Sequence, residues 1–224
     1  MEVKTEFLRP AAERCTQMAE FDVATVGEAA GLVQVMHSRI RALLPNVRIA
    51  GAATTCACFP GDNLSLHVAL QVAARGDVIV IGSCPPTMTG LWGGLAATSA
   101  KARGIVGVVA DGGVRDVAEL RRLDFPTWAT AVSSKGATKS TFGAVNVPVL
   151  CGDVLVHPGD LVLADDDGVV VVPLSDIDAV YEQARARQDR EDEMRPQLEA
   201  GATPFELLGL GTVLEKLGVR IVGA

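Results

Sequence analysis

Short apolar runs alternate with helical patterns through the first half of the chain. The runs 78–81 and 105–110 consist almost entirely of Val, Ile, Ala and Gly, and turn residues bound each of them. Runs of this length predict strands that are buried on both faces. Residues 95–103 and 117–123 have the spacing of helices, and a further strand begins at Phe125. The succession of strand, helix, strand, helix and strand predicts parallel strands joined by crossover helices.

The second half has a different pattern. Its apolar runs are short and are separated by Gly and Asp, which predicts antiparallel strands at 147–150, 154–156, 160–164 and 169–172. A charged helical segment then continues to about residue 200. We therefore predict one α/β domain over residues 1–224, with N-terminal helices in 11–44, a core in 47–173 and a C-terminal helical tail in 174–224.

Two polar segments within the strand–helix pattern are predicted as loops. If their strands are neighbours in a parallel sheet, both loops leave at the carboxyl edge, where α/β proteins bind ligands. Residues 83–94 end in Gly93-Gly94 at a helix start, where free N–H groups favour an anion. Residues 111–116 end in Arg115-Asp116, which can bind a carboxylate and a divalent cation. The alternatives are glycines that only permit the turn, and a solvated arginine beside a helix cap.

Other polar residues are more simply explained by structure than by chemistry. Asp165, Asp166 and Asp167 resemble a metal cluster, but acidic residues also form turns between strands. His67 lies in a helical pattern and is expected to pack in the core or to contact site residues without binding a ligand itself. Lys135 and Lys139 could meet an anionic substrate, although a solvated loop is the simpler reading. Cys84, before two prolines, has no nearby histidine to activate it.

Composition and charge narrow the class of protein. The chain has 224 residues, 49% of them hydrophobic and 4% aromatic, with a formal net charge of −7. An acidic balance argues against nucleic-acid binding, and the apolar content excludes a disordered chain. No apolar run is long enough to cross a membrane, and the first ten residues lack a signal-peptide core. We expect a cytoplasmic protein whose five cysteines are reduced.

Several motifs occur together and in order along the chain. They are Gly61-Asp62-Asn63, His67-Val68-Ala69, Gly90 followed by Gly93-Gly94-Leu95-Ala96, Ala102-Arg103-Gly104, Asp111-Gly112-Gly113-Val114-Arg115-Asp116, Phe125-Pro126, and Pro158-Gly159-Asp160 followed by Ala164-Asp165-Asp166-Asp167-Gly168-Val169. This series resembles the 4-hydroxy-4-methyl-2-oxoglutarate / 4-carboxy-4-hydroxy-2-oxoadipate aldolases. The regulator of ribonuclease activity A belongs to the same superfamily. The resemblance covers about residues 20–222.

The resemblance implies a fold and an activity. The fold is a compact α/β sandwich with a central β-barrel-like core of the swivelling β/β/α type, whose C-terminal helix packs on a neighbouring subunit. The activity is that of a divalent-metal-dependent pyruvate aldolase, a carbon–carbon lyase that cleaves a 4-hydroxy-2-oxo diacid and often decarboxylates oxaloacetate. Family members form homotrimers or homohexamers with active sites between subunits. Neither a nucleic acid nor a membrane is an expected partner.

The resemblance also assigns residues. The backbone of Gly93, Gly94, Leu95 and Ala96 would bind the pyruvyl carboxylate, and we call these four residues the carboxylate cradle. Arg115 would bind substrate oxygens and stabilise the enolate, and Asp116 would ligate Mg²⁺ or Mn²⁺. An acid on the last helix of a neighbouring subunit would complete the metal's surroundings. Glu191 matches it best, and Asp192 is the second choice.

One position departs from the family pattern. The aldolases carry an aspartate with twenty residues between it and the Arg-Asp pair, and counting back from Arg115 gives Gly94. Two alternatives to the aldolase therefore stay open. One is a noncatalytic regulator that acts by binding another protein, and the other is an enzyme with altered chemistry on another small anionic substrate.

Overall fold

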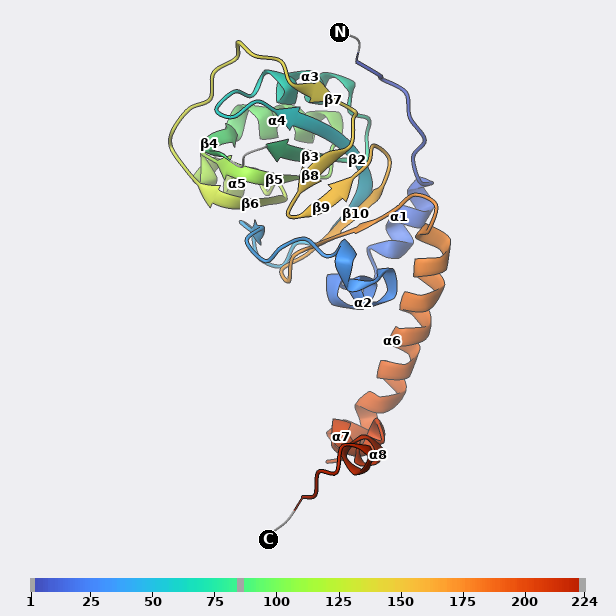
Figure 1. Ribbon diagram of the computed structural model, residues 1–224. Helices are drawn as coiled ribbons and strands as arrows, with labels where there is room; N and C mark the ends of the chain where they lie inside the picture. Colours follow the sequence, from blue (N-terminus) through green and yellow to red (C-terminus); the bar gives the residue numbers. More distant parts are fainter. Residues whose placement is uncertain (1–2, 84–86, 222–224) are drawn as a thin grey trace. The chain divides into compact units, whose positions relative to one another are not determined.

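The computed structural model describes residues 3–83 and 87–221 and contains a nine-stranded mixed sheet (Figure 1). Cys84 lies outside the described residues. The chain divides into two units, residues 1–184 and 185–224, and the sheet belongs to the first. Its strands are β1 (Arg41–Ala42), β2 (Ile49–Cys58), β3 (Asp77–Ser83), β4 (Thr87–Trp92), β5 (Gly107–Val114), β6 (Thr127–Val132), β7 (Ala144–Val145), β10 (Leu161–Ala164) and β11 (Val169–Val172). A separate ribbon consists of β8 (Val149–Cys151) and β9 (Val154–Val156).

The sheet order confirms the predicted change from parallel to antiparallel pairing. Strands run in the order β1-β6-β5-β3-β2-β10-β11, with β4 paired to β5 and β7 paired to β2. The pairs β2–β3, β3–β5 and β5–β6 are parallel. The pairs β2–β10, β10–β11 and β8–β9 are antiparallel. The parallel strands β3 and β5 are therefore neighbours, so the two segments that follow them leave at the same edge of the sheet.

Helices cover the sheet and complete three apolar cores. They are α1 (Ala12–Met18), α2 (Val23–Ala30), the short 3₁₀ helix η1 (Leu32–Gln34), α3 (Leu64–Val72), α4 (Gly94–Arg103), α5 (Val117–Leu123) and α6 (Ile177–Glu199). Alternate residues of β3 point to opposite faces: Ile79 and Ile81 pack beneath α3, α4 and α5, whereas Val78 and Val80 pack against the β8–β9 ribbon. Helices α1 and α2 and the start of α6 cover β10 and β11.

Three local predictions were wrong, each because tertiary contacts replace local ones. The segment 111–116 was predicted as a turn, yet β5 continues buried to Val114. The segment 83–94 was predicted as a loop, yet its described residues form β4 beside β5. Residues 35–44 were predicted within helices, yet their backbone bonds to other elements, since Met36 N–H donates to Val169 and His37 N–H donates to Gly152.

The second unit comprises the end of α6 with α7 (Pro204–Leu207) and α8 (Gly211–Lys216). Ion pairs with a spacing of four residues, Arg187 to Glu191 among them, run along this part of α6. Helix α7 begins with a reciprocal capping box between Thr203 and Glu206. No helix in the described ranges is both long and apolar enough to cross a membrane.

Candidate functional site

Helix α4 begins at Gly94, just after strand β4 ends, and a ligand can closely approach its first residues. Gly93 is its N-cap and offers no side-chain cap to the first turn. A Cβ on Gly93 would lie 2.6 Å from an Asp116 carboxylate oxygen, so only glycine leaves the space open. The first amides of a helix lack partners within it, and the helix dipole adds positive potential there. The start of α4 thus has the open space and the positive potential that the predicted anion site requires.

Arg115 and Asp116 lie where β5 ends and α5 begins. Asp116 is the N-cap of α5 and has a left-handed backbone, with φ of 58°. This conformation is uncommon for a residue other than glycine, and it turns the chain sharply at the strand end. The side chains of Arg115 and Asp116 are 44% and 48% exposed, and Arg115 Nε lies 3.7 Å from Asp116 Oδ2. The pair is thus accessible to a ligand.

The two predicted loops meet in the structure. Asp116 Oδ2 accepts a hydrogen bond of 3.1 Å from the Gly94 N–H, so a carboxylate already lies at the α4 N-terminus. The Gly94 amide thus donates to a carboxylate oxygen of the protein's own side chain. The cradle, Arg115 and Asp116 are brought together as predicted, although the roles assigned to them remain predictions.

Close contact between β4 and β5 makes this meeting possible. A Cβ on Gly113 would lie 2.7 Å from the carbonyl oxygens of Met88 and Thr89, so β4 can approach only a glycine. The β4–β5 register is irregular, pairing Gly90 with Gly113 and Trp92 with Val114. Because Trp92 lies opposite Val114, α4 and α5 begin side by side.

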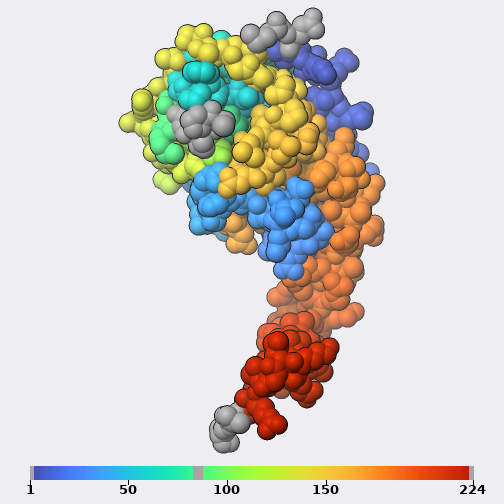
Figure 2. All heavy atoms as spheres, in the orientation of Figure 1, coloured from blue at the N-terminus to red at the C-terminus, as the bar shows by residue number. Residues whose placement is uncertain are grey.

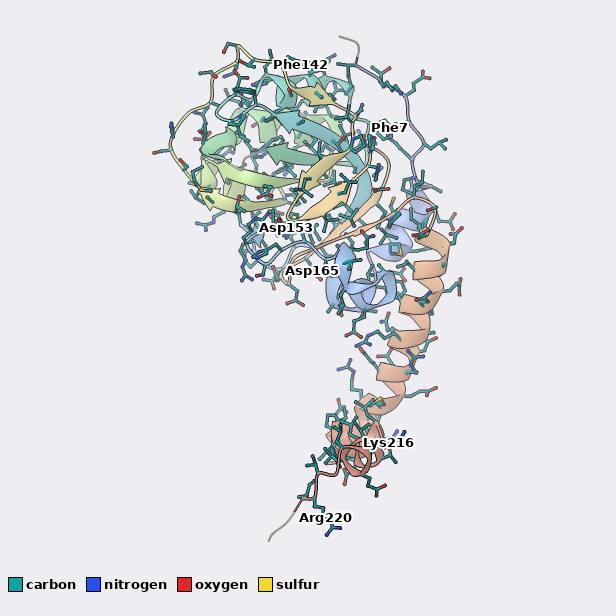
Figure 3. All side chains as sticks on the ribbon, viewed as in Figure 1. Phe7, Phe142, Asp153, Asp165, Lys216 and Arg220 are labelled. Atoms are coloured by element: carbon teal, nitrogen blue, oxygen red, sulfur yellow. The ribbon has the colours of Figure 1, made fainter. Side chains whose placement is uncertain are left out.

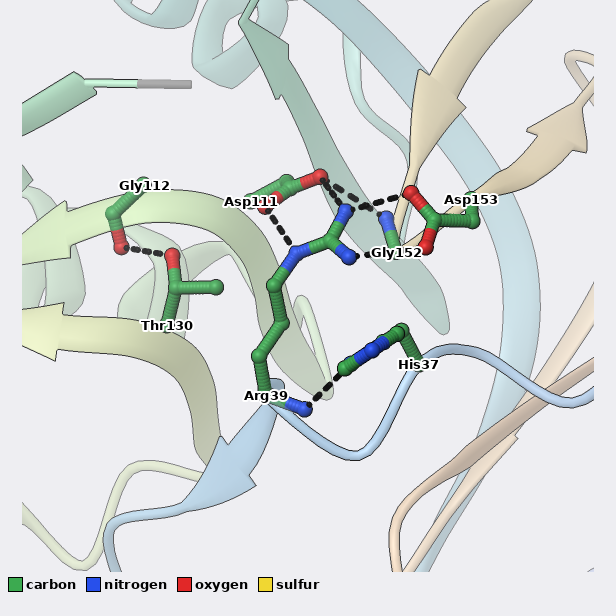
Figure 4. Close-up of polar contacts among 7 residues, drawn as sticks. All are labelled: His37, Arg39, Asp111, Gly112, Thr130, Gly152 and Asp153. Atoms are coloured by element: carbon green, nitrogen blue, oxygen red, sulfur yellow. Dashed lines mark hydrogen bonds and ion pairs between the residues drawn. The ribbon is translucent and has the colours of Figure 1, made fainter.

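An ion-pair network centred on the buried Asp111 holds β5 just before the site (Figure 4). Arg39 donates to both carboxylate oxygens of Asp111, at 3.2 and 2.9 Å, and to both oxygens of Asp153, at 2.8 and 2.7 Å. Asp111 also accepts from the Gly152 N–H at 3.0 Å. The hydrogen bonds that Arg39 donates to Asp153 and Asp111 raise the pKa of Arg39 and keep it charged. A polar residue can therefore occupy a buried strand, which the sequence prediction of a turn did not allow for.

Glu119 is the residue that the sequence analysis missed. A Cβ added to Gly94 would lie 2.7 Å from Glu119 Cγ and 3.7 Å from Asp116 Cβ. Glu119 thus fills the space next to the position where the similar aldolases carry an aspartate. Its carboxylate is 38% exposed and pairs with Arg122 at 2.6 Å, and this hydrogen bond lowers the pKa of Glu119. The available signal was its spacing, because a residue three after an N-cap lies in the same first turn.

The remaining candidates lie elsewhere or have structural partners. Asp165 (Figure 3) accepts from the Val23 N–H at 2.9 Å, and its carbonyl accepts from Trp128 Nε1 at 2.7 Å, so the turn interpretation is supported. Lys135 accepts the Gly90 N–H through its carbonyl, beside the site. Glu191 lies in the second unit and pairs with Arg187 at 2.9 Å. Its proposed contact with a neighbouring subunit remains a prediction, as does that of Asp192.

The donor set suits a hard divalent cation held partly by solvent. Mg²⁺ in enzymes is commonly bound by one or two carboxylates together with water and substrate oxygens. Asp116 supplies one such carboxylate at the Gly94 amide, and Glu119, whose carboxylate accepts from Arg122, packs beside Gly94. Within residues 3–83 and 87–221, no group of three or more His, Cys, Asp or Glu side chains forms a metal cluster. The residues present therefore fit an ion with few protein ligands.

The model of the Aldolase/RraA family, described as RraA-like, matches residues 22–171. The chain belongs to the RraA-like family. Residues of the cradle and the Arg115-Asp116 pair all lie within the matched range. A protein from Halalkalibacterium halodurans, named provisionally as a 4-hydroxy-4-methyl-2-oxoglutarate aldolase, is 32% identical over 90% of this chain and 94% of its own.

Solved structures agree with the family. A Streptomyces coelicolor protein described as an unusual member of the RNase ES inhibitor RraA family has a TM-score of 0.78 and 31% identity, covering 85% of this chain and 99% of its own. An RNA-processing inhibitor RraA from Thermus thermophilus has a TM-score of 0.57 and 32% identity, covering 62% of this chain and 84% of its own. The RraA-like family thus includes proteins named for catalysis and proteins named for inhibition.

Proposed function

We propose that this RraA-like protein is a cytoplasmic divalent-metal-dependent lyase that cleaves a carbon–carbon bond of a 2-oxo acid and releases pyruvate. The substrate would be a 4-hydroxy-2-oxo diacid, with oxaloacetate as a second substrate. The observation that carries the proposal is the meeting of Arg115, Asp116 and Glu119 at the open N-terminus of α4. Similarity to the H. halodurans protein supports it.

Each group has a physical role in this chemistry. The cradle amides would bind the pyruvyl carboxylate, since they are donors without a partner inside the helix and lie at its positive end. Arg115 binds the 2-oxo oxygen, where negative charge develops when the enolate forms. Asp116 and Glu119 would hold Mg²⁺ or Mn²⁺, which when bound supplies further positive charge for the enolate. Asp116 must leave the Gly94 amide for the substrate carboxylate to take its place.

The cleavage needs no reactant besides the substrate, because the proton lost from the 4-hydroxyl is balanced by the proton returned to C3. The 4-hydroxyl loses its proton, the C4–O bond becomes a carbonyl, and the C3–C4 electron pair moves onto C3 as the enolate. Proton return to C3 then gives pyruvate. Glu119 packs against Gly94 through its Cγ, and its carboxylate would orient a water that takes the hydroxyl proton. Oxaloacetate has no 4-hydroxyl proton to lose, because its C3–C4 bond breaks to release carbon dioxide. The resulting enolate takes up a proton at C3 in the same way.

The open surface around the site supports completion by a neighbouring subunit. Leu95, in the first turn of α4, is 89% exposed beside Arg115 and Asp116, themselves half exposed. Water around a developing enolate weakens electrostatic stabilisation, so covering the site would favour the reaction. We propose a homotrimer or homohexamer in which Glu191 or Asp192 of one copy approaches Asp116 of another.

A pyruvate-release assay tests the proposal. The purified protein is given oxaloacetate or 4-hydroxy-4-methyl-2-oxoglutarate with Mg²⁺, Mn²⁺ or EDTA. We expect turnover that EDTA abolishes and that Arg115→Ala and Asp116→Asn each lower by roughly 10²-fold or more, the loss typical of one electrostatic group. Asp166→Asn, in the turn away from the site, is the control. Metal-independent turnover, or none with either substrate, would contradict the proposal.

A noncatalytic regulator is the second candidate, favoured by the resemblance to the T. thermophilus RNA-processing inhibitor. Such a protein would bind a ribonuclease and need no metal. Capture of a ribonuclease together with no detectable Mg²⁺ or Mn²⁺ binding would favour it. Metal binding that Asp116→Asn removes would favour the lyase, or a related enzyme acting on another small anion.

A further inference from the structure

A groove between α3 and α4 begins at the carboxylate cradle. It has a volume of about 310 Å³ and includes two cradle residues, Leu95 and Ala96. Its other lining residues are His67, Leu70 and Gln71 of α3 and Ser99 and Arg103 of α4. Leu95, Ser99 and Arg103 are spaced by four residues, so they follow one face of α4 away from the cradle. A ligand whose carboxylate lies on the α4 amides can therefore extend into this groove.

The two ends of the groove differ in how their polar groups are used. At the far end, the Arg103 guanidinium donates to the carbonyls of Gln71 and Ala73, at 3.1 and 3.3 Å. Those bonds satisfy the last turn of α3, so Arg103 closes the groove rather than binding a ligand. His67 lies one turn earlier on α3, toward the cradle; its backbone N–H donates to the Asn63 carbonyl, and its imidazole lines the groove.

A pinned loop brings Lys139 to the His67 end. Asp62, just before α3, accepts from Thr138 Oγ1 at 2.7 Å, Ser140 N–H at 2.6 Å and Thr141 N–H at 3.0 Å. Lys139 lies between those anchored residues, so its backbone is fixed at the start of α3. In Figure 2 this loop, in yellow, lies on the surface beside α3, in cyan.

The same loop also contacts Arg115. A Cβ on Gly136 would lie 3.3 Å from an Arg115 guanidinium nitrogen. Two residues lie between Gly136 and Lys139, so their Cα atoms are at most about 11 Å apart. The loop thus runs from the guanidinium proposed to bind the 2-oxo group to the open end of the groove. Partial burial lowers the pKa of His67, and the positive charge of Lys139 lowers it further.

We infer that the α3–α4 groove is the subsite for the distal half of the substrate, and that Lys139 and His67 bind its second carboxylate. This inference rests on the proposed function. Lys139 supplies the charge, His67 donates a hydrogen bond, and Leu70 with Leu95 contacts the carbon chain. The residues select a 2-oxo diacid over a 2-oxo monoacid of equal length, because only the diacid presents an anion at the open end of the groove.

Binding of two uncleavable ligands tests the inference without turnover. Neither 2-oxoglutarate nor 2-oxopentanoate has a 4-hydroxyl, so calorimetry with Mg²⁺ measures affinity alone. Wild-type protein should bind the diacid more tightly. Lys139→Met should weaken 2-oxoglutarate about tenfold, the size of one charged hydrogen bond, and leave 2-oxopentanoate unchanged. His67→Ala should also weaken 2-oxoglutarate binding, and Lys139→Arg, which keeps the charge, should retain it.

Lys4→Met is the matched control, because it removes an equal charge from an exposed position in the N-terminal segment. Equal weakening of both ligands by Lys139→Met, or no weakening of either, would overturn the inference. Pyruvate release by the wild-type protein is measured separately. If turnover is present but Lys139→Met does not discriminate, the lyase stands and the subsite is wrong; if discrimination is present without turnover, the groove binds diacids and the lyase is wrong.

Discussion

Glu119 and Gly94 lie in contact, so the residue that fits at position 94 depends on the side chain at position 119. A side chain at 94 would meet Glu119 Cγ at 2.7 Å, closer than real Cβ contacts. The similar aldolases place an acid at this position, and here the side chain of Glu119, from the first turn of α5, occupies the space next to it. We propose that the Glu119 carboxylate takes the place of the missing aspartate.

This exchange predicts coupling between the two positions. Gly94→Asp should cost roughly 1–3 kcal/mol through overpacking against Glu119. In a Glu119→Ala background the same change should be close to neutral, because an acid in the first turn of a helix is itself favourable. Urea unfolding of the two single variants and the double variant measures the coupling. The double variant should also recover pyruvate release that Glu119→Ala loses, and additive effects would contradict the exchange.

At the scale of elements, the loop 133–143 is attached to α3 largely through one carboxylate. Asp62 accepts four hydrogen bonds from Thr138, Ser140 and Thr141 and one from the Leu64 N–H, which caps α3. Burial alone would raise the pKa of Asp62, but these donors lower it further than burial raises it, so it lies well below its usual range. The loop that contacts Arg115 thus depends on a charge before a helix.

The depressed pKa gives a pH prediction with a definite sign. An unfolded Asp has a pKa of about 3.9, so the stabilisation from Asp62 is present above that pH and is lost as the pH falls toward the lower folded value. Asp62→Asn should lower the melting temperature at neutral pH, and the difference from wild type should shrink between about pH 4 and pH 2. Thermal unfolding across this range measures it, with Asp166→Asn as control. A constant difference would contradict the assignment.

At the scale of the whole molecule, the chain consists of a self-sufficient unit and an appended helical one. The first unit contains the sheet, all three cores and the start of α6, whose Ile177, Val180 and Ala184 pack with α1 and α2. The second unit exposes apolar side chains of α7, α8 and their flanks, including Leu208 at 58% and Leu217 at 70%. Surfaces of this kind commonly bind another chain.

Deletion of residues 185–224 should therefore separate folding from assembly. We expect the shortened protein to keep the circular dichroism and cooperative unfolding of the full chain, because its cores are intact. Light scattering should show a smaller oligomer, and pyruvate release should be lost. Full-length Glu191→Gln combined with Asp192→Asn is the comparison: it should keep the oligomer and lose activity. An active truncated protein would remove both acids from the mechanism.

The sequence by itself determined the parallel strands, their crossover helices and the antiparallel second half. These features follow from apolar runs and turn residues, which depend on neighbours along the chain. It also indicated Gly93, Gly94, Arg115 and Asp116 as candidates for a site, because they occur at strand ends where ligands bind. Within the described residues, β4 and the full length of β5 escaped prediction, since Gly113 and Asp111 act as turn residues locally and as strand residues only when paired.

Only the tertiary structure decided what surrounds the site. Asp111 can be buried because Arg39, far away in sequence, neutralises it. Glu119 becomes relevant because α5 packs beside α4, and Lys139 because Asp62 fixes its loop at α3. These contacts join residues that local spacing does not relate, so no pattern along the chain could reveal them. Sequence thus determined which groups could do the chemistry, and packing decided which of them meet.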